Sequence, residues 1–112
     1  MPAYVISEVE VRDRSAMEAY RALAAQTIAQ YGGRYLARGG AAEVVEGGPP
    51  PKTIIIVEFP SMARAREWYA SAEYAAALKL RQTALERRLM FVEGAAESLG
   101  GLAPRVARSA NR

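Results

Sequence analysis

Apolar and polar residues alternate along two stretches of this chain, and the pattern predicts two β-strands with different surroundings. Along residues 3–11 the odd positions are small or apolar, whereas the even positions include Glu8 and Glu10. Because side chains of a strand point to opposite faces in turn, we expect the odd face to lie against helices. Residues 53–59 are apolar on both faces except at Glu58, so this strand needs cover on both sides.

Apolar residues recur at the i, i+3, i+4 spacing of amphipathic helices in three other segments. The first helix is predicted from about residue 15 to 31, and either Asp13 or Ser15 is expected to cap it. A second helix, which Ser61 is expected to cap, precedes Ser71, and a third, over residues 72–86, follows it, with Ser71 as the cap.

The remaining extended segments complete a β-α-β-β-α-β order. Residues 34–46 are predicted to be extended, with a bulge or tight turn at Gly39-Gly40, and residues 88–93 to form the last strand. With right-handed crossovers, this order predicts an α+β, ferredoxin-like domain with a four-stranded antiparallel sheet. Its two central strands, the first and the third, are expected to run parallel to each other.

The sheet is expected to have one face without helices. That face carries large apolar side chains, which would form an exposed patch in a monomer: Tyr4, Ile6, Ile54, Ile56, Met90 and Val92. Pairing of two sheets face to face about a two-fold axis would bury the patch. We therefore predict a homodimer through the sheet faces, in which two subunits form a dimeric α+β barrel.

The composition excludes several kinds of chemistry. The chain has no Cys and no His, which removes thiol nucleophiles, disulfides, Cys/His zinc sites, His-ligated haem and the commonest general base. Asp13 and Asn111 are the sole residues of their types. Any chemistry must come from Glu, Tyr, Arg, Lys, Ser or Thr, and no metal or cofactor is expected.

The charge is unevenly distributed. Residues 98–112 contain Arg105, Arg108 and Arg112 and no acid. The remainder therefore contains 12 of the 15 basic residues and all 12 acidic ones. We expect a neutral domain over residues 1–97 and a disordered basic tail over 98–112. A neutral domain without an apolar run of membrane-spanning length predicts a cytoplasmic protein that binds neither nucleic acid nor membranes.

Several motifs together carry a family resemblance. They are R-G-G at Arg38 to Gly40, P-K-x-x-x-x-x-E-F-P-S at Pro51 to Ser61, W-Y-x-S-x-x-Y at Trp68 to Tyr74, and F-V-E-G at Phe91 to Gly94. The chain resembles, over about residues 2–95, the domain-of-unknown-function family numbered thirteen-thirty, of the dimeric α+β-barrel superfamily. The resemblance implies the fold and homodimerisation, and it implies no established reaction.

The superfamily includes haem enzymes, small monooxygenases, isomerases and stress-response proteins. This sequence departs from the haem members that use a proximal His, because it has none. It retains Trp68 of the Asn-Trp-His arrangement of small monooxygenases, but lacks the His and has its Asn only in the tail. An analogy of fold to an enzyme is therefore weak evidence of a reaction.

Glu58 is the one acidic residue in an otherwise apolar central strand, so it needs a partner, a proton or water. Arg38 lies on the neighbouring extended segment, and the two are expected either to form a salt bridge or to line a ligand pocket, unless Glu58 is exposed. Trp68, Tyr69 and Tyr74 are expected around the junction of the last two helices, where they line the same pocket or pack in the core.

Glu8 and Glu58 are the weak candidates for catalysis. If the two central strands are parallel, both carboxylates end at similar depth on one face and can split their pKa values as acid and base. The alternative is that Glu8 faces solvent.

Three functions remain open from the sequence. The first is a homodimer that binds a small acidic or aromatic molecule between sheet and helices, through Arg38, Glu58, Trp68, Tyr69 and Tyr74. The second is a cofactor-independent isomerase or monooxygenase-like enzyme with a Glu base. The third is a structural or regulatory interaction protein without a pocket.

Overall fold

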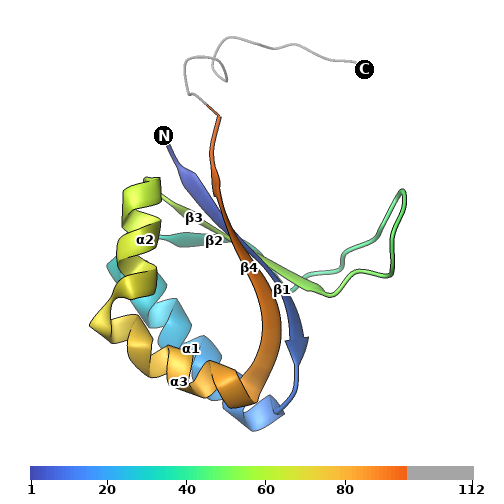
Figure 1. The fold of residues 1–112 in the computed structure, drawn as a ribbon, viewed down its shortest axis with the longest axis horizontal. Helices are drawn as coiled ribbons and strands as arrows, with labels where there is room; N and C mark the ends of the chain where they lie inside the picture. The colour runs from blue at the N-terminus through green and yellow to red at the C-terminus, as the bar shows by residue number, and fades with distance from the viewer. Residues whose placement is uncertain (96–112) are drawn as a thin grey trace.

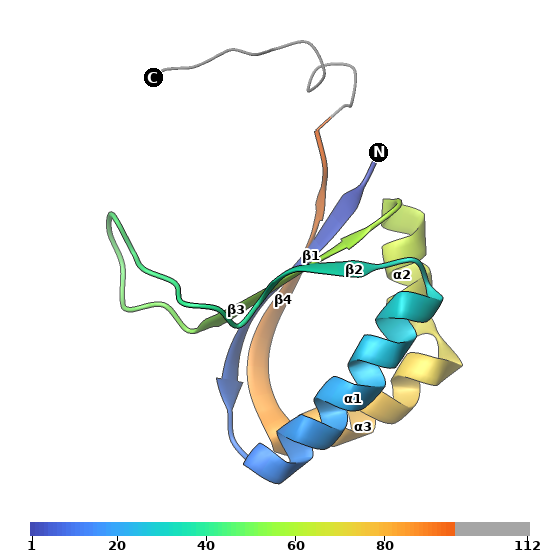
Figure 2. The same ribbon diagram turned by 180° about the vertical axis from the view of Figure 1, so that it is seen from behind.

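A four-stranded sheet with three helices on one face makes up the protein, as the computed structural model shows for residues 1–95 (Figures 1 and 2). The elements are β1 (Ala3–Val11), α1 (Arg14–Gln30), β2 (Arg34–Arg38), β3 (Thr53–Phe59), α2 (Met62–Ala70), α3 (Ala72–Ala84) and β4 (Leu85–Glu93). The strand order is β2-β3-β1-β4, which confirms the ferredoxin-like α+β fold. The tail predicted at 98–112 lies outside the described residues.

Every neighbouring pair of strands is antiparallel, including the two central strands β1 and β3. The expectation that these two strands run parallel to each other was wrong. The crossover through α1 returns the chain along β2 in the direction of β1, and the connection from β2 to β3 then reverses it. One reversal between β1 and β3 makes them antiparallel.

Caps fix the helix ends, and two boundaries differ from the prediction. The side chain of Asp13, and not of Ser15, caps α1 by accepting a hydrogen bond from the Ala16 N–H at 2.9 Å. Ser61 and Ser71 cap α2 and α3 in the same way. The last helix ends earlier than expected, because the chain becomes extended at Leu85, which pairs with Val11 and starts β4.

The β2–β3 connection is a long loop that projects away from the helices and the sheet (Figure 2). β2 ends at Arg38, so the extended segment predicted to residue 46 was too long. The register shifts between Tyr35 and Ala37, which places the bulge inside β2 and not at the glycine pair. Gly39 has φ 76° and its N–H donates to the Ile54 carbonyl at 3.0 Å, which closes the strand pair.

The odd positions of β1 and β3 face the helices and are the more buried ones, as the alternation predicts. They join side chains of all three helices in the core: Val5, Val9, Met17, Tyr20, Ala24, Ile28, Val57, Phe59, Ala65, Trp68, Tyr74, Ala77, Ala84 and Leu85. The even positions form the face without helices, which we call the open face. Register places Ile6 beside Ile56 and Met90 there.

Candidate functional site

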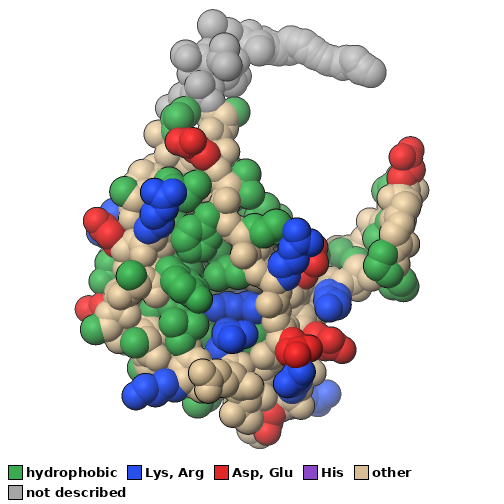
Figure 3. All heavy atoms as spheres, in the orientation of Figure 1, with side chains coloured by type: hydrophobic (Ala, Val, Ile, Leu, Met, Phe, Trp, Pro, Cys, Tyr) green, Lys and Arg blue, Asp and Glu red, His purple; other side chains and the backbone are tan. Residues whose placement is uncertain are grey.

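A cavity of about 50 Å³ lies between α1 and the helix-facing side of the sheet, with Trp68 of α2 in its wall. Figure 3 shows a hollow between the helices and the strands, in which hydrophobic side chains surround basic ones. Its size exceeds the roughly 10–15 Å³ that a water molecule needs and is smaller than the roughly 150 Å³ of a cavity that binds benzene. The cavity therefore accommodates a polar group, and the body of a larger ligand must extend through its mouth.

The mouth is marked by the exposed residues among those that line the cavity, Arg21 of α1 and Arg38 and Gly39 at the end of β2. The Arg38 guanidinium lies 4.1 Å from the centre of the Tyr35 ring, a stacking arrangement that holds the cation beside the opening. No Asp or Glu of residues 1–95 lines the cavity. Its electrostatic character is thus set by cations.

Arg87 is the basic residue inside. It is on the helix-facing side of β4, where Arg87 Nη1 donates to the Tyr20 hydroxyl at 2.7 Å and Nη2 to the Tyr74 hydroxyl at 2.9 Å. The two hydroxyls also hydrogen-bond each other. Burial, the largest cause, raises the pKa of Tyr74 well above its ordinary value, so this phenol is neutral. Within residues 1–95, Arg87 forms no ion pair with a carboxylate.

Ser7 is the second polar group in the wall. It is on the helix-facing side of β1, where 5% of its surface is exposed. Its hydroxyl has no hydrogen-bond partner among the described residues. A buried hydroxyl without a partner costs about 1–3 kcal/mol, which a bound water or ligand recovers.

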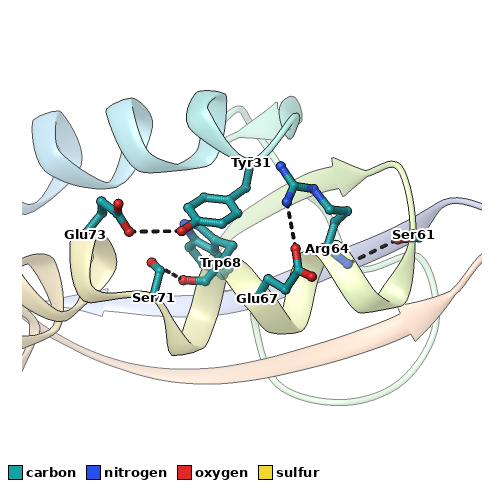
Figure 4. A network of polar contacts seen from close by, with 7 residues as sticks. All are labelled: Tyr31, Ser61, Arg64, Glu67, Trp68, Ser71 and Glu73. Atoms are coloured by element: carbon teal, nitrogen blue, oxygen red, sulfur yellow. Dashed lines mark hydrogen bonds and ion pairs between the residues drawn. The ribbon is translucent and has the colours of Figure 1, made fainter.

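Trp68 is held at the back of the cavity by its indole N–H, which donates to the Thr27 hydroxyl at 3.0 Å. In Figure 4, Ser61 and Ser71 bond the two ends of α2, the helix that carries Trp68, and Tyr31, which follows α1, reaches Glu73 of α3. The Trp68 ring packs against Tyr74 with centroids 4.2 Å apart. The aromatic group is therefore both core and cavity wall.

The structure separates the five residues that the sequence predicted to share one pocket. Arg38 and Trp68 line the cavity, and Tyr74 contacts it through Tyr20 and Arg87. Tyr69 is 40% exposed and packs on the outside of Trp68.

Glu58 lies on the open face. It forms a salt bridge with Arg34 at 2.7 Å, and the two line a wider surface depression of about 350 Å³. The expected Arg38–Glu58 pair was wrong because register places Arg34 opposite Glu58, and Arg38 lies four residues farther along β2. The register shift in β2 also sets Arg38 opposite Ile55, so that its side chain lies on the helix-facing side of the sheet.

Glu8 and Glu58 do not form an acid–base pair. Glu58 is opposite Tyr4 and Glu8 is opposite Ile54, so four residues of β1 separate them. At about 3.3 Å per residue, the separation is roughly 13 Å. This correction follows from the antiparallel direction of the two strands.

The sequence patterns did not identify Ser7, Tyr20 or Arg87 as residues of the cavity. A signal for Arg87 existed: extending the last strand back to Leu85 places Arg87 in a stripe with Leu85, Leu89 and Phe91 on the helix-facing side. A cation in an apolar stripe needs an explanation.

Residues 1–95 contain no group of three or more Asp or Glu side chains that could hold a metal ion. None of the helices within this range has the length and apolar character required to cross a membrane.

Solved structures share the fold at low sequence identity. A protein of unknown function from Rhodopseudomonas palustris is 22% identical, with a TM-score of 0.70 over 85% of this chain and 83% of that one. The cofactor-independent oxygenase SnoaB from Streptomyces nogalater is 10% identical, with a TM-score of 0.61 over 85% and 94%. A dimeric ferredoxin-like protein of unknown function from Bacteroides fragilis is 14% identical, with a TM-score of 0.56 over 83% and 96%.

These likenesses establish the fold, while the family follows from the sequence. None of the curated proteins compared with this sequence matches it significantly. The model of the family described as domain of unknown function (DUF1330) matches residues 2–95, which is nearly the whole described range. The chain therefore belongs to the DUF1330 family, as its motifs predicted.

Proposed function

We propose that this protein is a homodimer that binds a small acidic molecule with an apolar or aromatic body in the cavity between α1 and the sheet. The observation that carries the proposal is Arg87, a largely buried cation whose partners are two neutral phenols. Removing a cation from water costs several kcal/mol, and a neutral acceptor offsets less of this cost than an anion does. An anionic ligand would complete the site.

The surroundings of Arg87 favour the same ligand. Arg21 and Arg38 at the mouth add positive charge, and no acid among the lining residues opposes them. A cleft with one sign of charge and apolar walls concentrates ligands of the opposite sign. The apolar wall of Val5, Val9 and other core side chains suits the uncharged atoms next to the acid group, while the rest of the ligand body extends through the mouth.

Dimerisation through the open face is the second part of the proposal. Tyr4, Ile6, Ile54, Ile56 and Met90 are half-buried there in a single chain, and Val92 is 43% exposed. An apolar face of this kind is typical of a surface that another protein covers. The Bacteroides fragilis protein of the same fold is dimeric, which is consistent with a second copy as the cover.

The enzyme with a Glu base is less well supported. Glu8 and Glu58 lie on the open face, away from the cavity, and no Glu of residues 1–95 lines the cavity. SnoaB is a cofactor-independent oxygenase, but at 10% identity it supports the fold and not a reaction. An interaction protein without a pocket is the other alternative, and the cavity argues against it.

Titration with benzoate tests the ligand part of the proposal. Trp68 is the single Trp of the chain and lies in the cavity wall, so its fluorescence reports occupancy. We expect benzoate to change the fluorescence saturably and benzyl alcohol, which has no charge, to bind at least about tenfold more weakly. Equal binding of the two, or no binding of either, would contradict the proposal.

Arg87→Met tests the role of the buried cation, and Arg12→Met is the matched control. Arg12 is a surface residue paired with Glu86 and does not line the cavity. We expect Arg87→Met to weaken benzoate binding by roughly tenfold to a hundredfold, the effect of a charge-assisted hydrogen bond. Arg12→Met should leave the affinity unchanged.

A further inference from the structure

We propose that Tyr20 and Ser7, supported by Tyr74 and Arg87, form an oxyanion site that holds the ionised oxygen of a phenol or an enol. This inference rests on the proposed function, and it specifies the chemical class of the ligand. It derives from a count of the hydroxyl protons in the cluster: residues 1–95 do not provide a hydrogen-bond acceptor for every one of them.

The hydrogen count leaves one phenolic proton free. The Tyr20 and Tyr74 hydroxyls each accept from Arg87, and one of the two donates to the other. A phenol has a single O–H, so the donor of that bond has spent its proton. The other phenol keeps a proton for which residues 1–95 provide no acceptor.

Burial identifies the free O–H as that of Tyr20. Tyr74 has no exposed surface and does not line the cavity, whereas Tyr20 does. An outward-pointing proton on Tyr74 would have no water or ligand to meet. Tyr74 therefore donates to Tyr20, and Tyr20 directs its O–H into the cavity.

The arrangement strengthens this donor. Tyr20 accepts two hydrogen bonds, from Tyr74 and from the guanidinium of Arg87, and each withdraws electron density from its oxygen. Hydrogen bonds in a chain polarise one another, so the outermost O–H becomes a better donor. Because this row of hydrogen bonds begins at the positively charged guanidinium of Arg87, the Tyr20 O–H at its end is complementary to a negative oxygen.

Ser7 supplies the second donor. It is opposite Leu89 on β4, while Arg87 is opposite Val9, so Ser7 and Arg87 are diagonal neighbours on one face of the sheet. Such neighbours are roughly 7–8 Å apart, within reach of a long side chain. Ser7 has no partner among the described residues and lines the same cavity, so its hydroxyl is available to an oxygen bound beside Tyr20.

The donor set favours a phenolate or enolate over a carboxylate. Arginine binds carboxylates best through two parallel N–H donors. In this site the end-on fork of Arg87, one N–H each of Nη1 and Nη2, is taken by the Tyr20 and Tyr74 hydroxyls. The O–H groups of Tyr20 and Ser7 offer a pair of donors beside this cation, the kind of group that stabilises a single charged oxygen in an oxyanion hole.

The consequence for a bound phenol is ionisation. Two donors and a nearby cation favour the charged form, so the pKa of the ligand falls on binding. The O–H bond of the ligand breaks, its electron pair stays on the ligand oxygen, and the proton passes to water at the mouth. Nothing is oxidised or reduced in this step.

Absorbance titration with 4-nitrophenol tests the inference, because its anion absorbs visible light and its neutral form does not. We expect the bound probe to ionise with a pKa at least about one unit below its value in water, a tenfold shift in the equilibrium. A bound probe whose pKa is unchanged or raised overturns the inference. So does failure of 4-nitrophenol to bind to protein that binds benzoate, and in both cases the proposed function stands.

Variants separate the oxyanion site from general binding in the cavity. Tyr20→Phe removes the proposed donor, and Ser7→Ala removes a hydroxyl that no described group uses, so the second variant is expected to fold normally. Each should return the pKa of bound 4-nitrophenol toward its value in water. Tyr31→Phe is the control, since Tyr31 bonds Glu73 outside the cavity. An unchanged pKa in both Tyr20→Phe and Ser7→Ala contradicts the inference.

Discussion

The two faces of the sheet treat their charged residues in opposite ways. On the open face, Glu58 is paired with Arg34, and Glu8 is opposite Arg88 on β4. On the helix-facing side, the partners of Arg87 within residues 1–95 are two tyrosine hydroxyls and no carboxylate. A charged residue that interrupts the apolar pattern of a strand does not by itself indicate a ligand site. It does so when the fold gives the charge no counter-ion.

The largest predicted difference between the faces is in stability. Phe59 on the helix-facing side has no exposed surface, so Phe59→Ala should lower the free energy of unfolding by about 3–5 kcal/mol at any protein concentration. Ile56→Ala on the open face should lower it by an amount that depends on protein concentration, because its burial depends on a second copy. Urea unfolding at low and high concentration measures both. A concentration-independent loss for Ile56→Ala would contradict the dimer.

Charge at the mouth of the cavity should govern ligand association. Replacing Arg38 by Glu reverses a charge beside the opening, so the association rate of benzoate at low salt should fall by about tenfold, and the difference should shrink as salt is added. Arg34→Glu places the same change on the open face. Stopped-flow measurement of Trp68 fluorescence should show little change in the association rate for that variant, and an equal effect would mean that the cavity is not the entry site.

The buried phenol on the helix-facing side should make the protein sensitive to alkali. Burial raises the pKa of Tyr74 above the ordinary value of 10.0, so the unfolded chain releases this proton first. Stability is then intact below about pH 10 and falls as the pH rises further, by about 1.4 kcal/mol per pH unit. Urea unfolding across this range should show a shallower decline for Tyr74→Phe. Tyr69→Phe changes an exposed ring, so its free energy of unfolding should decline with pH as steeply as that of the wild type.

The smallest effect is expected at Glu58. Its partner Arg34 has 72% of its side chain exposed, so Glu58→Gln should cost about 0–1 kcal/mol in thermal or urea unfolding. It should leave the affinity for benzoate unchanged. A loss of affinity would include Glu58 in the ligand site, as the sequence had suggested.

The sequence correctly predicted the features of the fold that depend on short, local residue patterns. The range of β3, the odd and even faces of β1, and the caps Ser61 and Ser71 all agree with the structure. Each depends on residues that are close together along the chain, where alternation and capping preferences apply directly.

The site depended on features that no local pattern contains. One bulge in β2 moved Arg38 to the other face, and a register shift of one residue reverses every side chain that follows. Tyr20 meets Tyr74 across 54 positions and Arg87 across 67. Those contacts follow from how the helices pack on the sheet, and the sequence alone did not specify that packing.

Mapping the benzoate site by NMR tests the central claim most directly. Amide spectra recorded during a titration report every backbone position on both faces at once. The account predicts the largest shift changes at Ser7, Gly39 and Arg87, around the cavity, with the open face unaffected. Changes centred on Ile6 and Glu58, with none around the cavity, would contradict it.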